Sequence, residues 1–587
     1  MLRIFDLLLP AWCKPYPREH LASDLLAGVM VAILVLPQSL AYALLAGLPP
    51  QAGLFASILP VIVYALVGSS MTQSVGPVAI TAIMTFSVLS PIAEPGSPSY
   101  IAMAAALSLL SGVLVLALGA LRLGFLSNLL SRPVVAGFIT GSAVLILNSQ
   151  LKLLLGLQVQ GASAWDVLVK TLEHVPQSNP VTCVISTVGV LVLWGSRRWL
   201  ARTLQRFAVP RARAELVERL IPLLVISVAT LCVVVFDLDR LHGVAVVGDV
   251  KLGASFFTLD ALRFSSLGVL AIPALTLAFI GTVQNITMAQ ALAIKRRERI
   301  SANRELVGLG LSNIVAAFTG GMPVGGGLSR TAVNVASGGQ TPLASVVTGL
   351  GILVILAVGT AGFARIPLAI LAVTIVVAAI SMVDAAMLRR AWVYDRADAL
   401  AFLGAALGVL VFGLQLGILL GIGLSLGALL YRASTPHIAV VGRISASEHF
   451  RNVTRHGVET IPGVLFVRID ESMFFGNWAA VEARLMAEIA KVPGLHDLVL
   501  IMSAVNRIDL TALDALTDFQ QDLNASAIQL YLTEVKGPVQ DSLEGTIFLR
   551  RLQGLIFLST NAAFEHLKRE AALPAAKEAT SPPMTLN

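Results

Sequence analysis

Arg330 is the residue that first demands a chemical explanation. It is the single charged side chain between Glu305 and Arg365, and it lies in the glycine-rich stretch GGGLSRT at 325–331. A lone cation at membrane depth costs about 2.5 to 3.5 kcal/mol on insertion scales, and a bound anion would compensate that cost. A permanent pairing of the arginine with a backbone carbonyl or a helix end is the structural alternative. The residue therefore indicates an anion site, with that alternative left open.

A second glycine-containing stretch, VGPVA at 75–79, precedes another short apolar segment. Short segments interrupted by Gly or Pro at matching positions of two halves are typical of inverted repeats with discontinuous helices. Each half-helix would expose unpaired N–H groups and a partial positive charge at its N-terminus, which suits an anion. Pro77 is expected in the first turn of its helix, where a missing N–H costs nothing. Tight helix packing is the alternative reason for the glycines.

The composition defines the environment of these residues. Hydrophobic residues make up 56% of the 587, charged residues only 13%, and apolar runs of bilayer length recur from Leu25 to Leu430. This is the composition of a multi-pass membrane protein. The segment from Met1 to His20 has no apolar core followed by a cleavage site, so it is interpreted as a cytoplasmic lead-in, residues 1–23, and not as a signal peptide.

Fourteen membrane spans are predicted within residues 24–432, and their parity agrees with the charge pattern. Three arginine-rich loops, at 197–213, 295–299 and 389–396, follow the sixth, eighth and twelfth spans, which places them with the N-terminus on the cytoplasmic side. The net charge of +7 is explained by these loops, so nucleic-acid binding is not expected. The predicted spans are 24–46, 52–69, 76–91, 99–120, 130–152, 179–196, 218–237, 265–292, 304–319, 328–338, 343–362, 366–384, 397–413 and 415–431.

Catalytic and metal chemistry find little support. The three cysteines, Cys13, Cys183 and Cys232, form no disulfide framework or metal-ligand spacing, and eight histidines add none. No nucleophile with a base and no phosphate loop appears with workable spacing. An enzyme, a metal site and a cofactor are therefore not expected.

After Tyr431 the chain becomes richer in charge, and strand-like and helix-like stretches alternate. Strands are predicted at 463–469, 498–502 and 528–532, with helices at 477–490 and 510–523. This alternation predicts a soluble α/β domain over 436–569 with a mixed or parallel sheet. Residues 570–587, rich in Ala, Pro, Ser and Thr, are expected to form a disordered tail.

Several motifs, in this order and separation, resemble the sulfate permease (SulP) family of anion transporters, whose mammalian relatives include prestin. They are LPQSLAYA at 36–43, VGPVA at 75–79, SRPVVAGF at 131–138, NREL at 303–306, and GGMP at 320–323 followed by LSRTAVN at 328–334. The resemblance implies a uracil-permease-like fold of seven plus seven inverted helices, with a core domain (spans 1–4 and 8–11) and a gate domain (spans 5–7 and 12–14). The soluble part resembles the STAS domain of this family.

The resemblance also implies the substrate-binding residues. In such proteins the anion lies between the third and tenth helices with help from the first and eighth, which carries over to Gln38, Tyr42, Pro77, Val78, Gln284, Leu328, Ser329 and Arg330. Gln38, Tyr42 and Ser329 can donate hydrogen bonds without adding a negative charge. Interhelical hydrogen bonding is the alternative role for Gln38 and Tyr42.

Gln284 is a departure from the family pattern, because many members carry a carboxylate at this point of the eighth helix. No Asp or Glu occurs between Asp260 and Glu298. The simplest proton-symport mechanism is therefore missing, which favours exchange, uniport, or coupling through a group that the sequence does not identify. The alternative is that Gln284 shapes the substrate site of an ordinary symporter.

In the STAS-like region, Asp509 is expected to cap the helix that begins at Leu510. Thr511 falls where related bacterial anti-sigma-factor antagonists are phosphorylated, and a plain cap without regulation is the alternative. The leading functional hypothesis is a secondary transporter of small anions in the bacterial inner membrane, with sulfate the first candidate and bicarbonate, chloride and C4-dicarboxylates also considered. A uniporter or channel, an exchanger, and a STAS-based signalling scaffold are the alternatives. The resemblance further implies a homodimer, and the STAS region a cytosolic partner.

Overall fold

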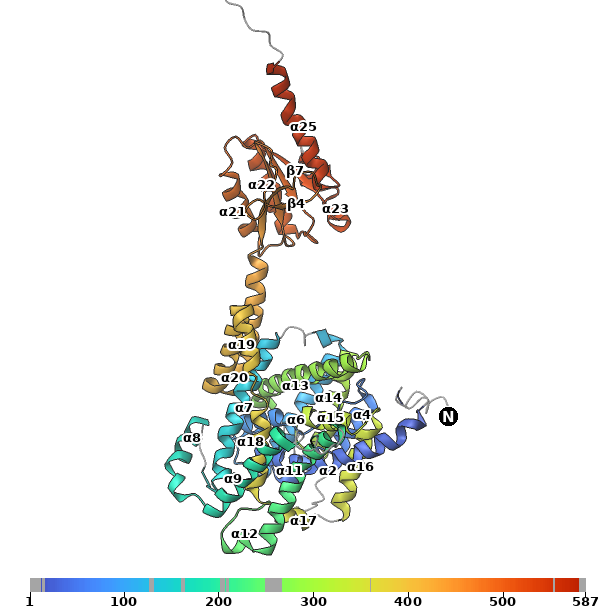
Figure 1. The fold of residues 1–587 in the computed structure, drawn as a ribbon, viewed down its shortest axis with the longest axis vertical. Helices are drawn as coiled ribbons and strands as arrows, with labels where there is room; N and C mark the ends of the chain where they lie inside the picture. The colour runs from blue at the N-terminus through green and yellow to red at the C-terminus, as the bar shows by residue number, and fades with distance from the viewer. Residues whose placement is uncertain are drawn as a thin grey trace, which may run out of the picture. The chain divides into compact units, whose positions relative to one another are not determined.

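In the computed structural model the chain forms two units, Met1–Leu426 and Gly427–Asn587. The structure describes residues 12, 16–125, 131–159, 164–200, 206, 211–248, 267–358, 361–552 and 555–579. Figure 1 shows a helical first unit and a smaller second unit that contains a sheet. Nine helices among the described residues are long and apolar enough to cross a membrane. The first unit therefore has the character of a membrane protein, as the composition predicts.

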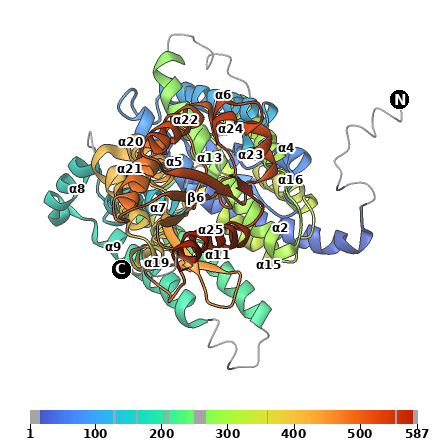
Figure 2. The ribbon, with the colours of Figure 1, turned by 90° about the horizontal axis from the view of Figure 1, so that it is seen from above.

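One layer of the first unit, called the core layer here, combines helices from both halves of the sequence. Helix α14 packs against α6 and α4, α16 packs against α2 and α4, and α13 packs against α6, so the two halves interleave (Figure 2). Its elements are α2 (Leu21–Leu45), preceded by η2 (Arg18–His20), α3 (Pro50–Phe55), α4 (Leu59–Val67), β1 (Val75–Gly76), α5 (Ala79–Leu89), α6 (Pro98–Ala120), α13 (Leu267–Arg296), α14 (Ala302–Phe318), β2 (Gly325–Gly326), α15 (Leu328–Ala336) and α16 (Leu343–Val358).

The second layer, called the gate layer here, is built around α18, which packs against α7 and α9. The two layers meet where Val134 of α7 and Val283 of α13 pack with Ala401 and Ala405 of α20. The gate layer contains α7 (Arg132–Leu154), α8 (Ala164–Glu173), η4 (Val175–Gln177), α9 (Pro180–Gly195), η5 (Ser196–Leu200), α11 (Arg211–Val235), α12 (Leu238–Leu241), α17 (Ala361–Ala364), α18 (Leu368–Ile380), α19 (Ala385–Tyr394) and α20 (Arg396–Ser434).

The helices agree with the predicted spans, with a few differences. The second span is divided into α3 and α4, and the last two spans are one continuous element, α20, interrupted at Gly413, whose φ of 83° is outside the helical range. Gly adopts such a conformation without a Cβ penalty. Helices α8 and α19 were not predicted, because both are short and amphipathic and lack the long apolar runs used to find spans.

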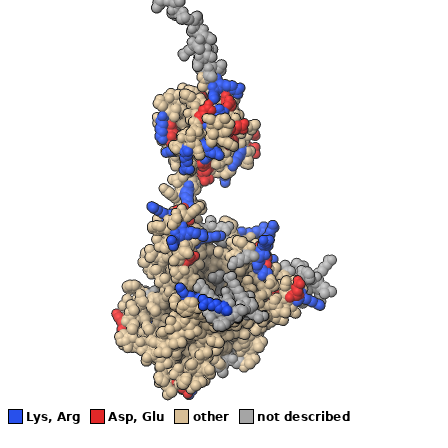
Figure 3. Space-filling model, viewed as in Figure 1, with Lys and Arg blue, Asp and Glu red and all other residues tan. Residues whose placement is uncertain are grey.

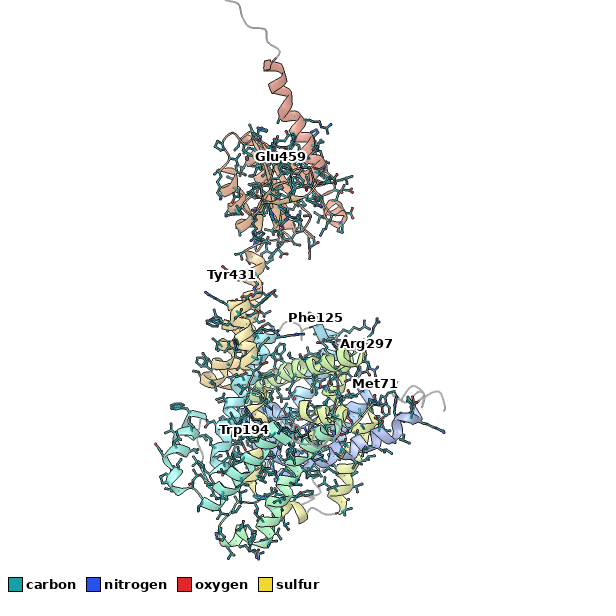
Figure 4. All side chains as sticks on the ribbon, viewed as in Figure 1. Met71, Phe125, Trp194, Arg297, Tyr431 and Glu459 are labelled. Carbon is teal, nitrogen blue, oxygen red and sulfur yellow. The ribbon has the colours of Figure 1, made fainter. Side chains whose placement is uncertain are left out.

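Charge is sparse on the visible face of the first unit, and lysines and arginines gather along one end of it (Figure 3). Arg297, which follows α13, and Phe125, which follows α6, lie at this same end (Figure 4). An end that carries the arginine-rich connections is expected at the cytoplasmic surface.

The second unit is an α/β domain with a six-stranded mixed sheet of order β4-β3-β5-β6-β7-β8. Strands β5 to β8 run parallel, and β3 pairs antiparallel with both of its neighbours. Its elements are β3 (Ile438–Arg443), β4 (Phe450–Asn452), β5 (Val464–Ile469), α21 (Trp478–Ile489), β6 (Asp497–Ile501), α22 (Leu510–Ala525), β7 (Gln529–Thr533), α23 (Gly537–Leu543), α24 (Ile547–Arg551), β8 (Ile556–Phe557) and α25 (Thr560–Ala579).

The five elements predicted in this domain are present within about two residues, and the mixed sheet is confirmed. Helix α25 continues to Ala579, into the segment 570–587 predicted as a disordered tail. Alanine-rich sequence favours helix, which the compositional argument for disorder did not weigh. Residues 580–587 lie outside the described part of the chain.

Candidate anion site

Two short strands meet at the centre of the core layer, and a half-helix follows each of them. Val75 pairs with Gly326 and Gly76 with Gly325 in the antiparallel pair β1–β2. Helices α5 and α15 begin a few residues later. A Cβ added at Gly326 would lie 2.8 Å from Gln73 Nε2, so glycine is required there for close approach. The predicted pair of half-helices is present, and the strand pairing between them was not predicted.

Side chains of α15 hold the segment that leads into α5. Arg330 donates from Nη1 to the carbonyl of Val75 at 3.3 Å and from Nη2 to the carbonyl of Pro77 at 2.6 Å. The hydroxyl of Thr331 accepts from the Ser74 amide at 3.0 Å, and Asn334 donates to the Thr72 carbonyl at 2.8 Å. The two half-helices are thereby fixed to each other.

Arg330 is only 3% exposed, and these bonds correspond to the backbone pairing that the sequence left open as an alternative. Carbonyl groups are neutral, so they orient the guanidinium without cancelling its charge. The guanidinium has five N–H donors in a planar fork. Arg330 can therefore hold the backbone segment before α5 and still attract an anion.

Pro77 does not lie in the first turn of a helix, and that expectation is wrong. The N-cap of α5 is Val78, with φ −136° and ψ 154°, and the helix begins at Ala79. Pro77 stays outside the helix, and its carbonyl faces Arg330 instead. In α15 the N-cap is Gly327, so Arg330 belongs to the first helical turn.

A cavity of about 990 Å³ lies against these groups. Its lining includes six of the eight predicted substrate-binding residues: Gln38, Tyr42, Pro77, Val78, Gln284 and Arg330. The side chains of the other two, Leu328 and Ser329, lie outside the described part of the structure. The cavity also reaches Arg132 of α7 and Arg390 of α19, so its walls come from both layers.

Gln284 approaches the strand pair from α13. Its Nε2 donates to the carbonyl of Gly326 at 3.3 Å, while its Oε1 is buried without a partner among the described residues. The neighbouring Asn285 accepts from Gln73 Nε2 at 2.5 Å. Two consecutive residues of α13 therefore contact β2 and the segment just before β1.

Glu305 is a buried carboxylate behind this arrangement, and the sequence analysis gave it no role. It is fully buried at the start of α14. One oxygen accepts from the amides of Ser69 and Ser70 at 2.8 and 2.9 Å and from the Ser69 hydroxyl at 2.7 Å. The other accepts from the Tyr64 hydroxyl and from Asn285 at 3.2 Å. Glu305 is part of the NREL motif, but the motif does not indicate that donors from three other segments surround the carboxylate.

In the second unit, Asp509 caps α22 as predicted. Its Oδ1 accepts from the Ala512 amide at 2.8 Å, and its Oδ2 accepts from the Phe475 amide at 2.9 Å. These backbone donors, Ala512 first, hold the pKa of Asp509 below its usual value. Thr511 is exposed in the first turn of α22.

Paired half-helices around a buried arginine, in a multi-pass helical unit followed by an α/β domain, are the arrangement expected of a membrane transporter. The sulfate permease family model matches residues 21–405 and the STAS domain model matches residues 457–563. The chain belongs to the sulfate permease family, with a C-terminal STAS domain.

Relatives along most of the chain include a probable sulfate transporter of Mycobacterium tuberculosis, 33% identical over 95% of this chain and 97% of that protein. Another is the chloroplastic sulfate transporter 4.1 of Arabidopsis thaliana, 31% identical over 90% of this chain and 78% of that protein.

Among solved structures, murine Slc26a9 in the inward-facing state is similar with a TM-score of 0.86 and 21% identity, over 97% of this chain and 95% of that one. The transmembrane domain of the cyanobacterial bicarbonate transporter BicA gives a TM-score of 0.58 and 23% identity, over 70% of this chain and 98% of that one. These likenesses confirm the fold predicted from the motifs.

Proposed function

We propose that the chain is a secondary transporter of small anions, with sulfate as the first candidate, and that the anion binds between the N-termini of α5 and α15. The observation that carries the proposal is Arg330, buried at the junction of the half-helices and lining the 990 Å³ cavity. Its charge adds to the partial positive charges of two helix N-termini. The predicted residues Gln38, Tyr42, Pro77, Val78, Gln284, Leu328, Ser329 and Arg330 are proposed as the binding set.

Sulfate is preferred because relatives covering most of the chain are named sulfate transporters. Bicarbonate, chloride and C4-dicarboxylates would satisfy the same cationic pocket, so competition must rank them. The site offers hydrogen-bond donors and one full positive charge, which are common requirements of all these anions.

Transport would proceed by an elevator-like movement of the core layer against the gate layer. The strand pair, both half-helices and Gln284 are bonded to one another in the core layer, and Gln38 lies on α2 of the same layer, so these groups can move as one body. The cavity reaches Arg132 and Arg390, near the end that carries the arginine-rich connections, so this conformation is proposed to open toward the cytoplasm. We place the protein in the bacterial inner membrane, with both termini cytoplasmic, as a homodimer.

The test is uptake of labelled sulfate into proteoliposomes, with bicarbonate, chloride, fumarate and nitrate as competitors, with and without an inward proton gradient. Saturable uptake inhibited by a subset of these anions supports the proposal. Uptake that needs an internal anion and ignores protons identifies an exchanger, whereas a current proportional to the anion gradient identifies a channel or uniporter. An absence of transport for every anion contradicts the proposed function.

A second candidate function comes from the STAS domain, whose capped α22 presents the exposed Thr511. In that case the membrane unit would anchor a signalling scaffold with a cytosolic partner. Transport by a chain that ends at Tyr431 would contradict it.

A further inference from the structure

A second cavity, of about 290 Å³, adjoins the proposed anion site and contains a carboxylate. Both cavities are lined by Gln38, Arg330, Ala378 and Ser381, so they meet at the proposed binding residues. The charged residues lining the smaller cavity are Arg330 and Glu218. Most of the remaining lining is apolar, including Val31, Leu34, Val35, Leu223 and Ile226.

The other residues of α11 that line this cavity show which face of the helix carries Glu218. Glu218, Pro222, Leu223 and Ile226 of α11 line the cavity together, at spacings that place them on one helix face. Helix α11 packs against α2 and α15, which carry Gln38 and Arg330. Glu218 is half-buried. The carboxylate therefore belongs to the wall of the cavity and not to the lipid-facing side of the helix.

We infer that Glu218 is a gate-layer counter-charge that competes with the transported anion for Arg330. When Glu218 is ionised, its negative charge opposes an anion in the adjoining site. When it is protonated, the opposition ends and the anion binds more tightly. The inference rests on the proposed function. Because residue 284 is a glutamine and cannot titrate, pH-dependent transport needs another titratable group, and Glu218 is the one inferred here.

The apolar lining gives this competition its strength. Two charges across a low-dielectric cavity interact more strongly than the same charges in water. An interaction worth one pKa unit corresponds to a tenfold change in affinity. Linkage is reciprocal, so an anion that binds better to the protonated protein must also promote proton uptake.

Asp384, the carboxylate that lines the larger cavity, is less suited to this role. Its Oδ1 accepts from the Met387 amide at 2.8 Å as the cap of α19, and the residue is exposed. A carboxylate that caps a helix already has a structural role in hydrogen bonding. Water also screens an exposed charge more strongly than a half-buried one.

Charged groups on the elements packed against α11 would set the titration of Glu218. Arg330 on α15 shares its cavity, and Arg198 in η5 lies with its guanidinium 5.7 Å from the Trp194 ring centroid. Asp24 on α2 accepts from the Thr341 hydroxyl at 2.6 Å, and Asp239 on α12 is bound to Arg365. Arg240 is the remaining charged residue of α12. Among these groups Arg330 is the one that lines the same cavity as Glu218.

The test is equilibrium binding of labelled sulfate to the purified full chain between about pH 4 and pH 8, a range that includes the ordinary glutamate pKa of about 4.3. The variants are Glu218→Gln, Glu218→Asp and the exposed Glu173→Gln as a matched control. We expect the wild-type dissociation constant to rise about tenfold with pH. Glu218→Gln should keep the low-pH affinity throughout, while Glu218→Asp and Glu173→Gln keep the pH dependence.

A flat wild-type profile, or an unchanged pH dependence in Glu218→Gln, would overturn the inference without touching the proposed function. Absence of sulfate binding in the wild type at every pH contradicts the proposed function itself, and the inference with it. If Glu218→Gln does not fold, proton uptake by the wild type on addition of sulfate in weak buffer decides: uptake supports the inference and its absence overturns it.

The position of Glu218 in the gate layer gives a second readout. If the core layer moves while the gate layer does not, Glu218 can affect the anion only in the conformation in which the anion site lies next to it. In oriented proteoliposomes, Glu218→Gln should lower the apparent sulfate dissociation constant measured from the side where this cavity opens and leave the opposite side unchanged. An equal change on both sides would place the carboxylate with the moving layer and overturn the assignment to the gate.

Discussion

At the scale of single residues, Arg330 has two roles that substitutions can separate. It orders the segment before α5 through the carbonyls of Val75 and Pro77, and it supplies the proposed positive charge. Lysine keeps the charge but lacks the planar fork that reaches two acceptors. Alanine removes both functions.

We expect Arg330→Ala to abolish saturable sulfate uptake and to lower stability, because buried carbonyls left unpaired cost about 1 to 3 kcal/mol. Arg330→Lys should retain weak binding with a strongly raised dissociation constant. Labelled-sulfate binding and thermal melting of the purified variants measure the two effects. Wild-type affinity in Arg330→Ala would remove the residue from the site.

Gly76 tests the geometry around the same guanidinium. A Cβ built at this glycine would lie 1.8 Å from Arg330 Nη1 and 2.7 Å from Cζ. Gly76→Ala must therefore displace the guanidinium, and we expect sulfate binding to fall at least tenfold, the equivalent of about 1.4 kcal/mol. Gly268 in α13 has nothing within 4 Å of such a Cβ, so Gly268→Ala is the matched control and should bind normally. Equal binding by both variants would contradict the described position of Arg330.

At the scale of elements, Glu305 connects α14 to α13 and to the turn that follows α4. Its carboxylate accepts five hydrogen bonds, and Asn285, one of the donors, also accepts from Gln73 just before β1. A buried charge is tolerated when it is fully hydrogen-bonded. Glu305 thus supports the strand pair indirectly, through Asn285.

Glu305→Gln is expected to lower the melting temperature markedly, because an amide N–H₂ would face groups that are themselves donors, at a cost of about 1 to 3 kcal/mol for each group left unpaired. Tyr64→Phe removes one donor of the five and should cost less. The exposed Glu94→Gln serves as the control. A larger loss in Tyr64→Phe than in Glu305→Gln would show that the carboxylate is not the centre of this network.

The elements also show what sequence reasoning reached and what it missed. The span pattern, both half-helices and five elements of the STAS domain followed from apolar periodicity and glycine, which act locally. The β1–β2 pairing, the Arg330 bonds to Val75 and Pro77, and the bond between Glu305 and Tyr64 join residues about 250 positions apart. No local pattern encodes such contacts. Glu218 was missed for the same reason, because only the packing of α11 against α2 and α15 brings it into the lining of a cavity that Arg330 also lines.

Asp509 gives the STAS domain a pH-dependent element. Its pKa is lowered by the amides of Ala512 and Phe475, so it stabilises the fold above its unfolded-state pKa of about 3.9 and loses this effect as pH falls through the lower folded-state value. Asp509→Ala should weaken the start of α22 by about 1 kcal/mol at neutral pH and by less in strong acid. Hydrogen exchange of peptides covering 510–525 in the full chain measures this, with Asp509→Asn expected to retain most of the cap. Equal protection in Asp509→Ala and wild type would contradict the capping role.

At the scale of the whole molecule, the proposed binding residues and the structured STAS domain belong to different units. The eight residues of the binding set, together with Glu218 and Glu305, precede Leu426, where the first unit ends. The second unit has its own apolar clusters, one of them containing Trp478, Leu498 and Phe519. Binding chemistry and STAS folding are thus separable in the sequence.

We therefore expect a chain that ends at Tyr431 to bind sulfate with the affinity of the full chain wherever it folds, because every group proposed to contact the anion is retained. The rate of transport and the amount of folded protein can fall, since α20 extends to Ser434 and would lose its last turn. Binding of labelled sulfate, normalised to the monodisperse fraction on size exclusion, separates affinity from yield. If the truncated chain folds but binds no sulfate, the STAS domain controls the conformation of the binding site. The signalling scaffold would then become the favoured function.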